Sequence, residues 1–341
     1  MKNALKKVAI AVSMAASVGA IAAAPAQATS FTFNSPNEIK TYTGGSNGSF
    51  IANDTVAASQ ALSDGNASSN VELWYSTENP TSNVGFTATQ GQYSATVSSV
   101  TASDWSSFGS QWLGDLLNTY TPFQSVWNGF SANTQSLVTS YFPLLGMGDP
   151  NIGGFQFGQN GGVELKLVGH LDVKTKLSNT LSTKLTQAWN GGVKLLFTGQ
   201  TTLPSASQVQ TKISSLQALL NLPVTPAAVK ATLTTQIAQL TSFKDVLSLQ
   251  ATLSTYQGQI GASEIAKVVN GNNTYYAYSF NPTASGITAS DDGVSYSAYY
   301  TWNTPGYTAP SAAVPEPSVM LGILGVGGVF VTRRKFKKAS I

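Results

Sequence analysis

The segment VGFTATQGQYSATVSSV, residues 84–100, predicts a β-hairpin and with it the class of the fold. Residues 84–89 and 93–100 are rich in β-branched and aromatic residues, and Gln90-Gly91-Gln92 supplies a short turn between them. The whole region 31–100 has this character, with short apolar or alternating runs separated by clusters of Gly, Asn, Ser and Asp. The sequence therefore predicts a mainly β (α+β) fold with a β-sandwich-like body.

Other strands and turns follow from the same signals elsewhere in the chain. The dipeptide Asn270-Gly271 predicts a second hairpin turn. Residues 41–48 and 63–70 are predicted loops, and residues 148–152 (GDPNI) a further turn. The further strands that we expect lie at residues 71–75, 163–172, 193–199, 265–269, 274–280 and 294–302.

Residues 104–145 change to a helical pattern. Trp105, Phe108 and Trp112 recur three and four residues apart, and Pro122 starts a second helical segment. Such an aromatic run is typical of a platform that stacks on carbohydrate, or of amphipathic helices that pack their aromatic face onto a sheet. Packing is the favoured interpretation, because aromatic side chains dominate core burial.

Residues 203–260 predict an inserted helical hairpin. Apolar residues recur every three or four positions on both sides of Pro223, and Thr225-Pro226 begins the second helix as N-cap and first helical residue. Gln, Thr and Ser dominate the other faces, so the pair is not a membrane element. The favoured interpretation is an insertion that packs on the β body or on itself. A coiled-coil arm for self-association is the alternative, although two helices alone have a thin core.

The N-terminal 28 residues resemble a secretory signal peptide. Lys2, Lys6 and Lys7 form a positive segment, and residues 8–24 are apolar and rich in small side chains. Ala26-Gln27-Ala28 then supplies a cleavage site of the A-x-A type. We therefore expect signal peptidase to cleave after Ala28 and the Sec translocon to export the rest.

The other end of the chain, residues 314–341, has three parts in a fixed order. Val314-Pro315-Glu316-Pro317 is followed by an uncharged apolar run at residues 318–332, which is short for a membrane span. A basic cluster then begins at Arg333 and Arg334, and lysines at residues 335, 337 and 338 continue it. Because Lys and Arg stay on the cytoplasmic side of a membrane, the body would face outward.

This tail resembles the C-terminal sorting signal of PEP-CTERM proteins of Gram-negative bacteria. Its signature is Val314, Pro315, Glu316 and Pro317, and Arg333 and Arg334 follow the apolar run in the expected order. The resemblance implies recognition and processing by exosortase, a cysteine-type transpeptidase in the membrane. It also implies an association with exopolysaccharide and biofilm matrix, so that exopolysaccharide is an expected partner. The chain would be held transiently in the inner membrane, with its C-terminus cytoplasmic, and then released to the cell surface or matrix.

The body, residues 29–310, also resembles a group of cyanobacterial PEP-CTERM proteins that has no assigned activity. The hairpin at residues 203–260 is where this chain departs from them. The segments that carry the resemblance are Gly148-Asp149-Pro150-Asn151, Gly169-His170, Ala262-Ser263-Glu264-Ile265, Tyr278-Ser279-Phe280 and Asp291-Asp292-Gly293-Val294-Ser295.

The charge and the cysteine content of the chain exclude some kinds of binding partner and some kinds of catalytic or metal site. The chain has 18 basic and 15 acidic residues, but the two targeting segments hold eight of the basic ones and Glu316. The exported body keeps 10 basic and 14 acidic residues, a net charge near −4, which excludes a nucleic-acid footprint. With no cysteine and one histidine, the chain has neither a cysteine nucleophile nor a usual zinc ligand set.

Catalytic patterns are also missing from the sequence. The only histidine, His170, lies in an alternating strand and is predicted to be structural, and no G-x-S-x-G elbow accompanies it. Asp291-Asp292-Gly293 is similar to part of a calcium loop but lacks its alternating ligands and closing Glu, so a tight turn is expected. We therefore predict no catalytic residue, no metal and no cofactor.

The leading hypothesis is a non-enzymatic protein of the cell envelope or extracellular matrix. A glycan-binding module is the alternative, with Trp74, the aromatic residues between 105 and 127 and the tyrosines between 275 and 300 as candidates. A secreted hydrolase is a third hypothesis. Exposed aromatic residues in a groove would favour glycan binding, and acids with shifted pKa values around a cleft would favour a hydrolase.

Overall fold

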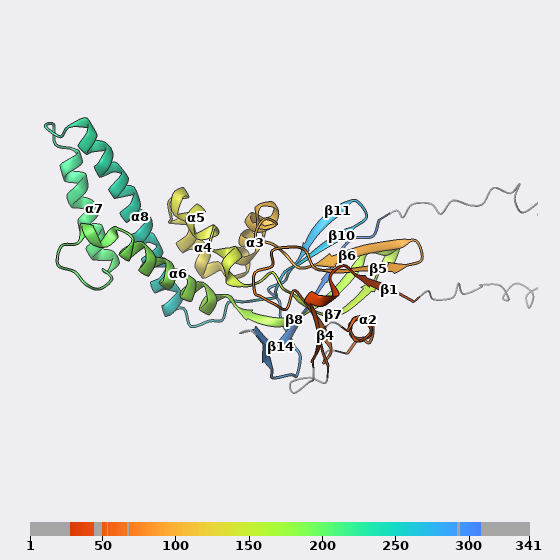
Figure 1. Cartoon of the computed structure of the whole chain (residues 1–341). Coiled ribbons are helices and arrows are strands. Elements are labelled where there is room, and N and C mark those ends of the chain that lie inside the picture. Colours follow the sequence, from red (N-terminus) through yellow and green to blue (C-terminus); the bar gives the residue numbers. More distant parts are fainter. Residues whose placement is uncertain (1–27, 44–49, 53, 67, 292–293, 308–341) are drawn as a thin grey trace, which may run out of the picture.

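The computed structural model describes residues 28–43, 50–52, 54–66, 68–291 and 294–307. The predicted sorting tail and all of the predicted signal peptide except the exposed Ala28 lie outside these residues. The described chain forms a body of two sheets, a helical part beside it, and a long two-helix arm beyond that (Figure 1).

The first sheet has five antiparallel strands in the order β1-β5-β6-β10-β11. The hairpin predicted from the sequence lies at its centre, and Gly91 makes the turn with a φ of 62°. The second predicted hairpin, at Asn270-Gly271, joins β10 to β11. The strands are β1 (Ser30–Phe33), β5 (Gly85–Gln90), β6 (Tyr93–Ser98), β10 (Ala266–Asn270) and β11 (Asn273–Ala277).

The second sheet is larger, and its main path runs β12-β14-β8-β7-β4-β2-β3, with β13 beside β14 and β9 beside β8. Its strands are β2 (Ile39–Tyr42), β3 (Phe50–Ala52), β4 (Asn70–Leu73), β7 (Asn151–Phe157), β8 (Val163–Asp172), β9 (Gly261–Ala262), β12 (Thr283–Ala284), β13 (Ser290–Asp291) and β14 (Val294–Asn303).

The two sheets face each other across one hydrophobic core. Phe86 of the first sheet contacts Phe155 of the second edge to face, with ring centroids 5.8 Å apart. Leu62 and other residues of α2 (Thr55–Ser63) complete this core. Short 3-10 helices η1 (Pro36–Glu38) and η4 (Gln159–Gly161) connect strands. The predicted α+β fold with a β-sandwich-like body is thereby confirmed.

A second core lies among the helices. Trp112 is fully buried, and Trp105 and Phe108 pack beside it, so the interpretation of this aromatic run as core packing is confirmed. Asp245 of α8 accepts a 2.9 Å hydrogen bond from Thr134 of α5 and fastens these helices together. The helices of this part are α3 (Trp105–Thr119), α4 (Thr121–Asn128), α5 (Ala132–Thr139), η3 (Phe142–Leu145), α6 (Val173–Asn190) and η5 (Val193–Leu196).

The predicted helical hairpin forms the arm. Helices α7 (Ala206–Leu220) and α8 (Ala227–Thr255) pack against each other, and the inner half of α8 also packs on α6 and α5. Pro226, which was expected at the first helical position, is itself the N-cap of α8. The outer half of the arm projects from the molecule, away from the sheets (Figure 1).

Two expectations about individual elements were wrong, and some elements, among them α6 and β7, were not predicted; β7 begins at Asn151, within the predicted turn 148–152. Residues 193–199 were expected as a strand but form η5, because they end the α6 segment instead of joining a sheet. Ile39–Tyr42 is strand β2, although residues 41–48 were assigned to a loop. Helix α6 was not predicted, although Leu177, Leu181, Leu185 and Trp189 recur every four residues, are all buried and carry its signal.

Both ends of the described chain meet at the β5–β6 turn. Ser30 pairs with Thr89, and their hydroxyl oxygens are 3.0 Å apart. The Tyr307 hydroxyl donates to the Ser94 carbonyl at 3.2 Å, and Ser94 is itself the partner of Thr89. The arm lies at the opposite end of the molecule (Figure 1).

Candidate functional site

A groove with a volume of about 600 Å³ runs between the outer strands of the two sheets. β11 ends the first sheet, and the last residues of β14 extend beyond its described partners β12 and β13. Helix α3 closes the third side. The side chains that give this groove its character are Asp104, Lys267, Tyr275, Tyr276, Tyr278 and Trp302.

Aromatic rings form two walls of the groove. Trp302 and Tyr275 meet edge to face with centroids 6.2 Å apart. Tyr276 stacks on Phe108 at 4.0 Å with an interplanar angle of 18°, and Phe108 is buried behind it. Because Trp302, Tyr275 and Tyr276 are only half-buried, each keeps part of its ring available to a ligand.

The one ion pair of the groove is satisfied by the protein itself. The Lys267 ammonium lies 2.8 Å from Asp104 Oδ1, and Asp104 Oδ2 accepts hydrogen bonds from Asn83 and from the backbone and hydroxyl of Thr101. Burial alone would raise the pKa of Asp104, but these donors outweigh it and lower the pKa to about 2. Asp104 is therefore an anion with a structural role at neutral pH.

Neutral polar groups complete the rim. Gln111, Thr274 and Asn303 line the groove and are exposed. Burial raises the pKa of Tyr278. Asp115, which accepts a hydrogen bond from the Tyr278 hydroxyl at 2.8 Å, raises it further, so this tyrosine also stays neutral. The groove thus combines apolar ring faces with uncharged hydrogen-bonding groups, a lining typical of small-molecule and saccharide sites.

A separate cluster of acids lies where the β body meets the helical part. Glu72, Asp149 and Glu264 are all buried, and the backbone N–H of Asn151 donates to Glu264 at 3.2 Å. Tyr42 donates its hydroxyl to Glu72 at 2.8 Å. Three of the five segments that carry the sequence resemblance meet here, since Ile265 bonds to Met147 and Ser263 to Ser279 through their backbones. These segments therefore build a junction.

Burial gives these carboxyl groups an unusual protonation. It raises the pKa of Asp149 to about 8, and the nearby charges of Glu78 and Glu72 add to the effect. Burial and the charges of Asp149 and Glu72 also raise the pKa of Glu264 well above its usual range. The ion pair of Glu78 with Lys176 of α6, at 3.0 Å, is the nearest compensation. Asp149 and Glu264 are thus neutral at pH 7.

This cluster lies apart from the groove. It lines none of the hollows described above or below, and within the described ranges no three Asp, Glu, His or Cys side chains are arranged to hold a metal ion. Several buried oxygens nearby lack a hydrogen-bond partner, namely Asp149 Oδ1, Asn151 Oδ1, Asn70 Oδ1 and Thr41 Oγ1. Protonated carboxyl groups and internal water suit such oxygens.

His170 packs as part of the fold. Its Nδ1 lies 2.7 Å from the Tyr300 hydroxyl, and a Cβ on Gly261 would come within 1.9 Å of the ring. Burial lowers the pKa of His170, although Asp172 opposes the shift. Tyr300 is fully buried, so this pair faces the interior and not the groove.

The structure separates the candidate residues of the sequence. The sorting residues of the tail and Ala26 lie outside the described residues. Of the candidate aromatics, Trp105 is buried and Trp74 donates to Thr77 away from the groove, whereas Tyr275 and Tyr276 line it. Asp291 pairs with Val294 as a hairpin requires, and Asp292 and Gly293 lie outside the description.

Two groove residues were missed because no local pattern marks them. Asp104 and Lys267 are 163 positions apart in sequence and become partners only when α3 packs beside β10. Trp302 was assigned to a strand end. Strand alternation places it on the same face as the buried Tyr300, and only its position near the end of β14, against Tyr275 of β11, leaves it half-buried.

Comparison of the chain with protein-family models, with curated proteins and with solved structures finds no match. Within the part of the chain that the structure describes, no helix has the length and apolar character needed to cross a membrane. The groove and the sequence signals at the two ends are therefore the features from which a function can be inferred.

Proposed function

We propose that this chain is an exported, non-enzymatic protein of the cell envelope or extracellular matrix that binds a neutral polysaccharide in the groove between β11 and β14. The observation that carries the proposal is the half-buried pair Trp302 and Tyr275 beside a rim of uncharged polar groups. Sugar rings present apolar C–H faces and polar hydroxyl edges, which match aromatic walls and a rim of amide and hydroxyl groups.

The charge of the groove supports a neutral ligand. Lys267 and Asp104 neutralise each other, so neither is free to attract an acidic or a basic sugar. Recognition then depends on ring contact and hydrogen bonds, which salt screens little.

A hydrolase is less well supported by the same geometry. Glycosidases of the usual kind need one protonated and one ionised carboxyl group on either side of the bond to be cleaved. In the groove, Asp104 is held by five hydrogen-bond donors, counting the weak contact from Tyr276. The carboxyl groups with raised pKa, Asp149 and Glu264, are buried elsewhere.

The expectation of export and sorting is part of the proposal. It is supported by the tail signature Val314-Pro315-Glu316-Pro317 and by the meeting of residues 30 and 307 at one end of the body. A chain held by its tail would turn the arm away from the point of attachment (Figure 1).

Affinity electrophoresis tests the groove. Hydroxyethyl cellulose serves as a neutral probe and alginate as an anionic one, each cast into a native gel. We expect retardation by the neutral probe, and Trp302→Ala and Tyr275→Ala should each weaken it at least fivefold, about 1 kcal/mol. The matched control is Trp74→Ala, which removes a half-buried tryptophan outside the groove.

Equal retardation of Trp302→Ala and the unchanged chain would disprove binding at this groove. Retardation by alginate alone, abolished by 0.5 M salt, would show that charge and not ring contact drives binding.

A separate experiment tests sorting. Replacing Glu316 and Pro317 by Ala in the native cell should leave full-length, membrane-held protein. Intact-mass measurement reports the processing. If that variant is processed normally, the sorting assignment is wrong, but the proposal of glycan binding in the groove is unaffected.

A further inference from the structure

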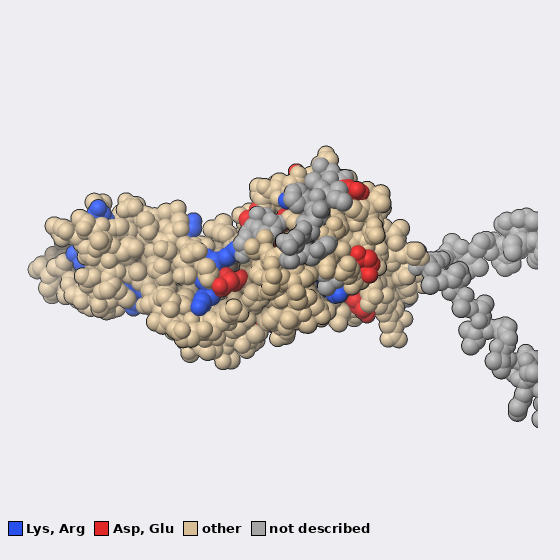
Figure 2. All heavy atoms as spheres, turned by 90° about the horizontal axis from the view of Figure 1, so that it is seen from below, with Lys and Arg blue, Asp and Glu red and all other residues tan. Residues whose placement is uncertain are grey.

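The two ends of the molecule carry opposite charge. Residues 173–260, which form α6, η5 and the arm, contain seven lysines and one acid, whereas residues 28–172 contain ten acids and two lysines. Figure 2 shows Lys atoms spread over the helical end and Asp and Glu atoms over the β body. An arm with this charge favours a partner surface that carries acids.

The tip of the arm is apolar as well as basic. Leu219, Leu222, Val224 and Val229 are large apolar residues with exposed side chains at the turn between α7 and α8, and Val224 is 85 % exposed. Lys230 follows in the first turn of α8 and has no ion-pair partner among the described residues. The tip therefore presents a small apolar surface with the Lys230 ammonium beside it.

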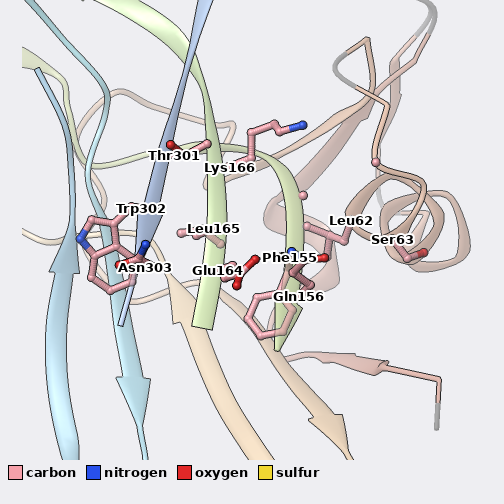
Figure 3. Close-up of a pocket in the computed structure, with 12 residues that line it drawn as sticks. Leu62, Ser63, Phe155, Gln156, Glu164, Leu165, Lys166, Thr301, Trp302 and Asn303 are labelled. Carbon is pink, nitrogen blue, oxygen red and sulfur yellow. Dashed lines mark hydrogen bonds between the residues drawn. The ribbon is translucent and has the colours of Figure 1, made fainter. Parts of the chain in front are cut away.

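A hollow of about 260 Å³ on the β body has the complementary properties (Figure 3). Strand residues Gln156, Glu164 and Lys166 lie on one side of it, and Leu62 and Ser63 of α2 on the other. Leu62, Phe155 and Leu165 also border it, although each is at most 6 % exposed, and Thr301, Trp302 and Asn303 of β14 complete the lining.

The charges around this hollow are acidic on balance. Glu164 is exposed and accepts a hydrogen bond from Gln156, and the exposed Asp64 follows Ser63 in the chain. The Lys166 ammonium makes a cation–π contact with Tyr299, 5.2 Å from the centre of its ring. Gly154 leaves the space open: a Cβ there would meet Lys166 no closer than 3.8 Å.

Pairing of two arms with each other is disfavoured by charge. The arm, residues 203–255, contains three lysines and one acid, Asp245, which is buried against Thr134, so two arms side by side would bring mainly cations together. The hollow and its acids belong to the opposite end of the same molecule, so the fitting occupant is a second copy.

We propose that the arm tip of one copy docks into the hollow beside α2 of the next, with Val224 in the hollow and Lys230 near Glu164. The contact is heterologous, because the two surfaces differ, and a docked pair keeps one free tip and one free hollow. Such contacts generate rings or open chains. Because Trp302 and Asn303 line both this hollow and the groove, the contact is tested without polysaccharide, so that its outcome reports docking alone.

Disulfide trapping between full chains tests the contact, because the chain has no cysteine of its own. A mixture of Val224→Cys and Ser63→Cys chains should form a disulfide-linked dimer, with at least ten times the yield of either chain alone. A chain that carries both substitutions should give a ladder of higher oligomers. The matched control replaces Val224→Cys by Val56→Cys, another valine that is 77 % exposed, and should give only the background yield.

Filling the hollow provides a second measurement. Adding Gly154→Leu to the Ser63→Cys chain should reduce the mixed dimer at least tenfold, and the backbone of Gly154 imposes no strain on a side chain. Lys230→Glu should reduce the yield several-fold. Dimers of Val224→Cys alone at the yield of the mixture would show arm-to-arm pairing and overturn the proposal. A mixture at background yield would overturn it as well.

Discussion

Two carboxyl groups of this protein have little exposed surface and yet have opposite pKa shifts. Asp104, beside the groove, has a pKa lowered to about 2, whereas Asp149, at the junction of the body and the helices, has a pKa raised to about 8. Both are buried, and burial is the first cause of a shift at each.

The deeper burial of Asp149 and the number of hydrogen-bond donors together explain the difference. The Asp104 carboxylate accepts hydrogen bonds from Lys267, from Asn83 and from the backbone and hydroxyl of Thr101. These donors compensate the cost of its buried negative charge. Asp149 has an oxygen without a partner and two acids, Glu72 and Glu78, as its nearest charges. Depth alone does not predict the charge of a buried carboxyl group, because its donors decide whether the anion is tolerated.

The largest expected effect is a loss of stability as the pH rises from 5 to 8. Asp149 and Glu264 keep their protons in the folded chain but lose them near pH 4 when unfolded, so the folded state binds more protons in this window. Unfolding is then favoured by about 1.4 kcal/mol per pH unit for each retained proton. Urea unfolding at pH 5, 6.5 and 8 measures the slope, and a flat profile would contradict the protonated cluster.

Glu264→Gln should separate this cluster from the rest of the molecule. The amide stays neutral and its oxygen can still accept the Asn151 N–H, so the variant should gain at least about 1 kcal/mol over the unchanged chain at pH 8. At pH 5 the two should agree within about 1 kcal/mol. If the variant is destabilised equally at both pH values, Glu264 is ionised in the folded chain.

Asp104→Asn should have the opposite behaviour. Loss of the carboxylate leaves Lys267 without its counterion and weakens charge-assisted hydrogen bonds, so we expect a loss of about 2 kcal/mol at pH 7. Because the folded pKa is lowered, this loss is complete above pH 4 and shrinks as the pH falls toward 2. Urea unfolding at pH 7 and at pH 3 gives the comparison, and a loss that grows at low pH would rule out an ionised Asp104.

Tyr276→Phe should have the smallest effect on the Asp104 site. Its hydroxyl is 3.5 Å from Asp104, at the limit of hydrogen bonding, and the stacking on Phe108 survives the substitution. We expect a change below about 0.5 kcal/mol in unfolding free energy. A loss as large as that of Asp104→Asn would show that Tyr276 is a principal donor.

Much of the fold follows from local patterns. The two hairpins were predicted because Gly91 and Gly271 supply the positive φ that each turn needs. The arm was predicted because Pro223 and Pro226 interrupt one apolar stripe and start another. Helix α2 (Thr55–Ser63) escaped prediction, since its alanines and serines give no clear stripe beyond the buried Leu62.

The candidate site was predicted only in part. Tyr275 and Tyr276 belonged to the candidate tyrosines, but nothing in the sequence distinguished them from the buried Tyr300. Which side of a strand faces solvent depends on what packs against it, and here that is α3, more than 150 residues away from β11.

The sequence by itself determined the class of the fold, the two hairpins, the arm and the absence of cysteine chemistry, because these depend on neighbours within a few residues. The tertiary structure alone decided that Trp302 and Tyr275 form a groove wall, and that Asp149 and Glu264 share a junction. Both outcomes depend on contacts between segments that are distant in sequence. The exposure of these side chains, their hydrogen-bond donors and their neighbouring charges are set only when those segments pack together.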